Sequence, residues 1–381
     1  MSLQEEPLSL DAAREEISQI DKQFAKLFKQ RMDAAASIAA YKSKRGIPVV
    51  DDAQRERVFE RARQNFAEAG GSEELSAYYV RAIENIVELS EQYQYKLVEG
   101  VKCAYNGVPG AFAHIAAKRV FPSGQAISYA GFEEAYRAVE NGECDNAILP
   151  IENSYAGEVG QVVDLIFSGS LYINGVYDLR ITQNLLGVPG AKISDIKHAV
   201  SHAQALSQCE PYLRKLGIEP VEATSTAAAA KMVSESGDTS FAAIASEETA
   251  QLYNLCLLDH DINKSNVNTT RFVVLSRIPN EKLSVARPEQ RTFILLFSVN
   301  DEAGALVKVL NVIGAFGFNM KTLRSRPLKD KPWQYYFYVE AEGDETSEVA
   351  QSMLSRLASV CDVIKIAGSY SDTPQELTKK Q

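Results

Sequence analysis

The sequence predicts a multidomain chain with an all-α N-terminal domain, a two-lobed α/β middle domain and a ferredoxin-like α+β C-terminal domain. Three observations support this prediction. Apolar residues recur at heptad spacing in the first helix, short apolar strands alternate with helical runs in the middle, and a βαββαβ order closes the chain. At 381 residues the chain is also long for a single core. We expect domains at residues 1–99, 100–280 and 290–371.

The composition is that of a globular protein with a formal net charge of −10. This charge argues against nucleic acid and anionic membrane as partners, because phosphate binding needs concentrated cations. Neither a signal pattern nor an apolar run long enough to cross a bilayer is found. The cysteines are dispersed, without a CxxC pair, at Cys103, Cys144, Cys209, Cys256 and Cys361. We expect reduced thiols, a cytoplasmic location, and neither a metal nor a cofactor.

The first helix is expected over residues 9–45, and its apolar seam contains a cation. The seam consists of Ile17, Ile20, Phe24, Leu27, Arg31, Ala34, Ile38 and Tyr41. A guanidinium in such a seam costs several kcal/mol unless an anion meets it, so Arg31 indicates a site for a negatively charged ligand. Lys42 points to the same side, whereas Arg14 points about 100° away and suits a cavity in a partner subunit. The alternative is an arginine that snorkels at the helix surface.

Two further helices carry polar residues where packing requires apolar ones. The second is capped by Asp51 or Asp52 and runs to about Ala69, and the third spans Glu73 to Val98. The out-of-place residues are Arg55 and Glu56 on the second helix and Ser90 and Gln94 on the third. We interpret them as the lining of one shared polar cavity, with a register device or a buried water site as alternatives. A very long first helix makes a poor monomeric core, which favours an intertwined dimer.

This polar set resembles the active site of the all-helical chorismate mutase family over residues 1 to 99. The matching positions are Arg14, Arg31, Lys42, Asp52, Arg55, Glu56, Ser90 and Gln94. The resemblance implies a pericyclic rearrangement of chorismate to prephenate, with the substrate's two carboxylates held by Arg31, Arg55 and the partner subunit's Arg14. Lys42 and Gln94 would donate to the ether oxygen as its bond breaks. Asp52 and Glu56 would lie near the hydroxyl, and Ser90 would assist.

From Val101 onward, short apolar strands alternate with helical runs, which indicates βαβ units and a mostly parallel sheet. A second set of strands starts with one over residues 181–188, and the strand 272–276 is expected to return to the first lobe. Two lobes joined by crossing strands, as in periplasmic binding proteins, leave a cleft where loops present polar groups. The loops expected there are residues 107–110, 150–154, 201–204 with Gln208, 224–226 and 268–272. Ser225 and Thr226 could equally serve as helix caps.

These loops resemble those of prephenate dehydratase over residues 101–279: a glycine loop, then PIENS, ATSTAA and TRFVVL in that order. The resemblance implies that Thr270 protonates the departing hydroxyl of prephenate while CO₂ is lost and the ring becomes aromatic. Threonine is a weak acid, so neighbours must polarise its hydroxyl. The residues implied to bind the substrate are Glu152, Asn153, Ser201, Gln208, Ser225, Thr226, Arg271 and Phe272. At Ala111, Ala113 and Ala203 the chain departs from residues common in the family.

The C-terminal module resembles the ACT regulatory domain. Its first helix is expected to start at Gly304, and a free helix N-terminus is a ready carboxylate site. The implied ligand motifs are Gly304, Ala305, Leu306 and Val307, and Arg324, Ser325, Arg326 and Pro327. Arg324 stands where the family has glutamate, so we expect L-phenylalanine as effector with weakened or altered feedback. Residues 371–381 are expected to form a disordered tail.

Together these resemblances predict a bifunctional chorismate mutase/prephenate dehydratase of phenylalanine biosynthesis, assembled as a homodimer or a larger homo-oligomer. Its small-molecule partners would be chorismate, prephenate and L-phenylalanine. Two alternatives stay open. One is a non-catalytic small-molecule sensor, because two-lobed α/β clefts often only bind ligands. The other is a mutase whose dehydratase-like middle domain is degenerate and senses a ligand.

Overall fold

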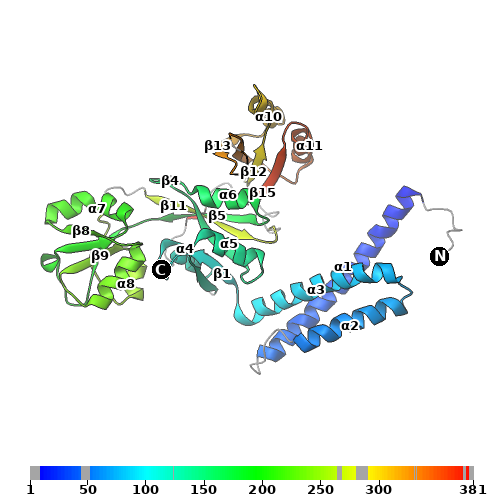
Figure 1. Cartoon of the computed structure of the whole chain (residues 1–381), viewed down its shortest axis with the longest axis horizontal. Coiled ribbons are helices and arrows are strands. Elements are labelled where there is room, and N and C mark those ends of the chain that lie inside the picture. Colours follow the sequence, from blue (N-terminus) through cyan, green and yellow to red (C-terminus); the bar gives the residue numbers. More distant parts are fainter. Residues whose placement is uncertain are drawn as a thin grey trace. The chain divides into compact units, whose positions relative to one another are not determined.

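The computed structural model describes residues 9–43, 52–122, 124–263, 268–279, 291–329, 331, 333–371 and 375–376. The chain divides into two compact units, residues 1–100 and 101–381, which can be followed by colour in Figure 1. Among the described residues, no helix is long and apolar enough to cross a membrane. The linker expected at residues 280–290 lies outside the described residues.

The described part of the first unit consists of three helices, α1 (Leu10–Ser43), α2 (Asp52–Glu68) and α3 (Glu73–Glu99), close to the predicted bounds. Ser72 caps α3 by accepting a hydrogen bond from a backbone N–H of its first turn. Both α1 and α2 pack on α3. Small side chains allow the close approach of α1, because Ala35 and Ala39 are 5% and 1% exposed.

The heptad stripe that was predicted as a packed seam of α1 is exposed in the single chain. Its large members are 48–62% exposed: Ile17, Ile20, Phe24, Leu27, Ile38 and Tyr41. One reason is geometric, because Ala35 and Ala39 meet α3, whereas Leu27, Ile38 and Tyr41 lie roughly 80–140° around the helix from them. Arg31 is half-buried at the border between the two sides. Within the described part of the first unit, α1 thus presents a long apolar surface to solvent.

The second unit begins with a lobe built on a mixed sheet (Figure 1). Its strands are β1 (Lys102–Asn106), β2 (Gln125–Tyr129), β3 (Asn146–Asn153), β4 (Gly157–Glu158), β5 (Tyr172–Arg180) and β11 (Thr269–Ser276). β1 pairs in parallel with β2 and β3, whereas β11 lies antiparallel between β3 and β5. The predicted return of this strand to the first lobe is thereby confirmed. The helices of the lobe are α4 (Phe112–Val120), α5 (Phe132–Glu140) and α6 (Gly160–Ser168).

The second lobe contains a five-stranded sheet in the order β10-β6-β9-β7-β8. Its strands are β6 (Asn184–Gly187), β7 (His198–Ser201), β8 (Glu219–Glu222), β9 (Phe241–Ala245) and β10 (Cys256–Asp259). Its helical elements are η1 (Ile193–Asp195), α7 (Ala203–Leu216), α8 (Thr226–Ser236) and α9 (Glu247–Leu252). The strand predicted over residues 181–188 is shorter than expected, because residues 181–183 form a crossing between the two sheets.

The C-terminal module has the predicted βαββαβ order and continues the sheet of the first lobe. Its elements are β12 (Arg291–Ser298), α10 (Ala305–Ala315), β13 (Met320–Pro327), β14 (Tyr335–Glu342), α11 (Glu348–Leu357) and β15 (Val363–Ser371). One face of its sheet packs against α10 and α11, and the other joins the core of the first lobe through Ile294, Leu296, Tyr336 and Tyr338. A short strand, β16 (Gln375–Glu376), pairs with β5 where a disordered tail was predicted.

The module and the first lobe meet at a glycine whose replacement should be costly. Gly368 of β15 pairs with Ile173 of β5. It has φ +140°, and an added Cβ would lie 2.2 Å from the carbonyl oxygen of Ile173. Because backbone cannot move aside as a side chain can, we expect Gly368→Ala to lower the free energy of unfolding by about 2–4 kcal/mol. Calorimetry of the whole chain would measure this as a lower transition temperature.

Gly317→Ala is the matched control for this substitution. Gly317 also has a positive φ, +82°, but nothing lies within 4 Å of an added Cβ. Its replacement should cost only the backbone strain of about 1–2 kcal/mol. Equal losses of stability in the two variants would contradict a close backbone contact at Gly368.

Candidate active sites

The first unit brings together three of the residues predicted for its polar cavity. The guanidinium of Arg31 on α1 donates to the hydroxyl of Ser90 and, at 3.3 Å, to the carbonyl oxygen of Ile86, both on α3. Ser90 and Gln94 are 4% and 8% exposed and lie one helical turn apart. The Oε1 atom of Gln94 is buried without a hydrogen-bond partner among the described residues. Burial lowers the pKa of Arg31. The half-buried cation suits an anionic group, and the unpartnered amide oxygen of Gln94 suits a hydrogen-bond donor such as a hydroxyl on the same ligand.

Arg55 has a carboxylate partner that was not predicted. Its Nε donates to one oxygen of Glu91 at 3.2 Å, and a terminal nitrogen donates to the other oxygen. Glu91 follows Ser90 on α3, so the ion pair borders the Arg31 cluster. This bidentate ion pair holds the guanidinium of Arg55 in one orientation.

The other predicted mutase residues lie outside this cluster or outside the described structure. Arg14 is exposed beside Asp11, at 3.7 Å between nitrogen and oxygen. Glu56 is exposed, and Lys42 is half-buried in the last turn of α1. The side chain of Asp52 lies outside the described residues, as does Asp51. Their roles stay predictions.

In the second unit, a cavity of about 400 Å³ is lined by residues of both lobes. The predicted residues in its wall are Asn153, Gln208, Ser225, Thr226 and Thr270. Ser225 also caps α8, since its Oγ accepts the backbone N–H of Ala228 at 3.0 Å. No lysine or arginine is among the described residues of the wall. Nor does the described part of the chain hold a group of three or more His, Cys, Asp or Glu side chains that could bind a metal ion.

A chain of side-chain amides ends on the hydroxyl of Thr270. The Nδ2 atom of Asn153 donates to Thr270 Oγ1 and to Asn268 Oδ1, each at 2.9 Å, and Asn268 Nδ2 donates to Gln208 Oε1 at 3.1 Å. Two backbone N–H groups of the following turn fix the other end of the Asn153 amide. A hydrogen bond donated to an oxygen stabilises the negative charge that develops there as a proton leaves. Asn153 is therefore placed to polarise the Thr270 hydroxyl, which is what the resemblance to prephenate dehydratase requires of its neighbours.

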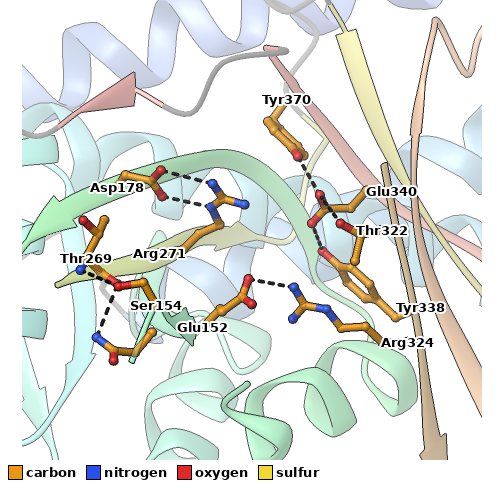
Figure 2. A network of polar contacts seen from close by, with 11 residues as sticks. Glu152, Ser154, Asp178, Thr269, Arg271, Thr322, Arg324, Tyr338, Glu340 and Tyr370 are labelled. Carbon is orange, nitrogen blue, oxygen red and sulfur yellow. Dashed lines mark hydrogen bonds and ion pairs between the residues drawn. The ribbon is translucent and has the colours of Figure 1, made fainter. Parts of the chain in front are cut away.

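Strand alternation separates the predicted substrate residues into two sets. β3 and β11 pair Asn153 with Thr270 and Glu152 with Arg271, and successive side chains of a strand point to opposite faces. The first pair lines the cavity, whereas the second does not. Arg271 forms a two-point ion pair with Asp178 at 2.9 and 3.1 Å, and the hydrogen bonds to Asp178 raise the pKa of Arg271. Figure 2 shows Glu152 directed instead toward Arg324 of β13.

Two other predicted substrate residues belong to the core. Ser201 is fully buried and its Oγ donates to the carbonyl oxygen of Ile244 at 2.7 Å. Phe272 is 1% exposed within the apolar core of the first lobe. Conversely, Gln183 and Asn268 line the cavity but were not predicted as site residues. Gln183 is 3% exposed, and its Oε1 has no hydrogen-bond partner among the described residues.

Each of the two units matches a known protein family. Residues 13–95 match the family described as chorismate mutase type II, and residues 103–280 match prephenate dehydratase. A bifunctional chorismate mutase/prephenate dehydratase of Buchnera aphidicola subsp. Acyrthosiphon pisum is 31% identical over 95% of this chain and 96% of that protein. The chain belongs to the bifunctional chorismate mutase/prephenate dehydratase family. It is thus an enzyme of phenylalanine biosynthesis with a mutase unit and a dehydratase unit.

Solved structures resemble the dehydratase unit. A prephenate dehydratase of Arthrobacter aurescens in complex with L-Phe is 28% identical, with a TM-score of 0.65 over 73% of this chain and 93% of that chain. A protein described as GqqA, a novel type of quorum quenching acylase, is 31% identical, with a TM-score of 0.66 over 72% of this chain and 98% of that chain. The two likenesses agree with a two-lobed α/β architecture for the unit that follows the mutase helices.

The predicted effector motifs lie on two elements of the C-terminal module of this bifunctional enzyme. Gly304 precedes α10 with φ +82°, and Ala305, Leu306 and Val307 form the first turn of that helix. Arg324, Ser325, Arg326 and Pro327 end strand β13. On this strand, Arg324 and Arg326 are half-buried against acidic residues of the dehydratase lobe, whereas Ser325 and Pro327 are exposed.

Proposed function

We propose that residues 1–99 rearrange chorismate to prephenate, and that residues 100–280 convert prephenate to phenylpyruvate in the cavity between the two lobes. The observation that carries the proposal is the amide chain ending on Thr270 in the cavity wall, in a chain of this bifunctional family. In the first step, Arg31 holds a carboxylate of chorismate. Lys42 and Gln94 stabilise the ether oxygen while its bond breaks, and no proton transfer is needed.

In the second step, the bond between the ring and its carboxylate breaks and CO₂ leaves. The electron pair of that bond makes the ring aromatic as the C–O bond on its far side breaks. Thr270 gives its proton to the departing oxygen, so that water is released, and Asn153 stabilises the threonine oxygen until a proton returns from water. Asn268 and Gln208 keep Asn153 in place through their hydrogen bonds.

A coupled assay tests the proposal. Chorismate is supplied to the whole chain, and chorismate, prephenate and phenylpyruvate are each quantified over time. The proposal expects prephenate to rise transiently and phenylpyruvate to accumulate. Accumulation of prephenate alone would favour the degenerate dehydratase, and binding without turnover of either acid would favour a sensor.

We further infer that residues 290–371 form an ACT domain that binds L-phenylalanine. The βαββαβ order and the free N-terminus of α10 support this role, since backbone N–H groups there can receive a carboxylate. Because Arg324 is engaged by Glu152, we expect feedback weaker than in family members with glutamate at this position. Repeating the coupled assay with phenylalanine measures it. The dispersed cysteines favour a cytoplasmic location.

We propose that the exposed apolar stripe of α1 is buried against a second copy of the chain. Contiguous apolar surface of this kind is rare on monomers, and the long α1 suits an intertwined dimer in which the partner subunit's Arg14 completes the mutase site. We expect Leu27→Glu to raise the dimer dissociation constant about a hundredfold, because a buried carboxylate without a partner is costly. Light scattering during gel filtration measures the mass. Lys22→Glu places the same charge on the opposite, exposed side of α1 and should leave the dimer intact.

A Leu27→Glu chain with the mass of the wild type would contradict an interface on this stripe. The proposal also expects mutase activity to fall with the dimer, while dehydratase turnover of added prephenate serves as the folding control.

A further inference from the structure

Three carboxylates of the dehydratase lobe face two arginines of the C-terminal module. Arg324 contacts Glu152 at 2.6 Å and Glu158 at 3.5 Å, and its guanidinium lies 5.7 Å from the ring centre of Tyr338. Figure 2 shows Arg324 reaching from β13 to Glu152 on β3. The pair is 22% and 33% exposed, so its charges are screened less than those of a surface pair.

The second arginine binds the same acidic edge. Arg326 contacts Glu158 at 2.6 Å and the two oxygens of Asp164 at 2.8 and 3.2 Å. Gly160 makes room for it, since an added Cβ there would lie 2.1 Å from Arg326 Nη1. Glu158 is thus shared by both arginines, which links Glu152 and Asp164 into one network. A network with this fit fixes geometry more strongly than isolated pairs do.

The hairpin that carries these acids also forms part of the cavity wall. β3 and β4 pair Glu152 with Glu158 and Asn153 with Gly157. Asn153, Gly157 and Glu158 all line the cavity, whose described wall contains no lysine or arginine. Prephenate carries two carboxylates, so an unneutralised Glu158 would repel it. The nearest neutralising charges that the structure gives Glu158 are Arg324 and Arg326 of the module.

We propose that Arg324 and Arg326 are positioning residues of the dehydratase reaction. They neutralise Glu152 and Glu158, which lets the doubly charged substrate enter the cavity. They also hold the β3–β4 hairpin in place, so that Asn153 keeps its hydrogen bond to Thr270. The inference rests on the proposed dehydratase function. It also gives the module a direct route to the cavity, because an effector that moves β13 must move the charges that hold this hairpin.

The test compares prephenate kinetics of the whole chain and of Arg324→Gln. We expect KM to rise about tenfold with a smaller fall in kcat, because electrostatic repulsion acts mainly on substrate entry. The rise in KM should shrink at high ionic strength. Mutase turnover of the same chain reports correct folding, and Arg324→Lys, which keeps the charge, should restore most of the affinity.

A double substitution shows whether Arg324 acts through Glu152. In a Glu152→Gln background one of the two carboxylates is gone and Glu158 keeps its contact with Arg326 at 2.6 Å, so Arg324→Gln should raise KM by less than about threefold. Lys329→Ala is the matched control, since Lys329 contacts Asp164 at 3.2 Å but is 73% exposed and touches no hairpin residue in the described network. Its KM should stay within about twofold of the wild type.

An unchanged KM in Arg324→Gln, or an equal effect of that substitution in both backgrounds, would overturn the inference. So would a loss of thermal stability without any kinetic change, which is what a purely structural pair predicts. A wild-type chain without dehydratase activity would instead overturn the proposed function. The affinity of each variant for prephenate, measured by calorimetry, would then replace KM in the comparison of Arg324→Gln with the wild type and with the Glu152→Gln background.

Discussion

Replacing Thr270 by alanine is expected to lower the kcat of the dehydratase about a thousandfold. The substitution removes the proton that converts the departing hydroxyl into water, and it removes the oxygen that Asn153 polarises at 2.9 Å. The rest of the wall is unchanged, so the KM for prephenate should move by less than about threefold. Phenylpyruvate formed from added prephenate gives both constants. Mutase turnover of chorismate by the same chain should be unaffected, because that site lies in the other unit.

Two variants on the same strand control this result. Thr269→Ala removes an equal side chain from the neighbouring position, which strand alternation directs away from the cavity. Its kcat should stay within about twofold of the wild type. Thr270→Ser retains the hydroxyl and should keep most of the activity. A Thr270→Ala enzyme that still forms phenylpyruvate at the wild-type rate would show that another group supplies the proton.

The motifs of the sequence identified the pair Asn153 and Thr270 but placed Glu152 and Arg271 beside them. Neighbours in a motif lie on opposite faces of a strand, so the four residues divide once the pairing of β3 and β11 is known. The sequence predicted that this strand returns to the first lobe, yet periodicity alone does not set its register. Residues two positions apart on a strand point to the same face, so Asn268, two residues before Thr270, could also have been predicted to line the cavity. It lies in a loop that was already predicted at the cleft.

Contacts between distant segments left no signal in the sequence. The heptad spacing located α1 to within two residues and brought Arg31 and Ser90 into one predicted cavity. The spacing could not show which surface covers the apolar stripe. The same apolar pattern is needed whether the stripe packs on a helix of its own chain or on a partner subunit. The ion pair between Arg324 and Glu152 joins residues 172 positions apart. Such a pair follows from the docking of two domains, which spacing does not encode.

Replacing Arg31 by alanine is expected to lower kcat/KM for chorismate by about a hundred- to a thousandfold. The guanidinium is the half-buried cation of the cluster and is held by Ser90 and the Ile86 carbonyl. Its loss removes a fixed positive charge from the position where we propose that a substrate carboxylate docks. The stability cost should be only about 1–2 kcal/mol, because the lost hydrogen bonds leave a hydroxyl that still bonds to Ile86. Chorismate consumption measures the activity, and dehydratase turnover of added prephenate measures the amount of folded enzyme.

Lys29→Ala separates this effect from a general loss of positive charge on α1. Lys29 lies two residues away, is 77% exposed, and pairs with Asp33 within its own helix. Such an exposed pair contributes little to stability and nothing to a site on the other side of the helix. Lys29→Ala should therefore turn over chorismate at the wild-type rate. If Arg31→Ala did the same, the carboxylate of the substrate would have to dock elsewhere. The contact between Arg31 and Ser90 would then only join the two helices, and no bound ligand would account for the unpartnered amide oxygen of Gln94.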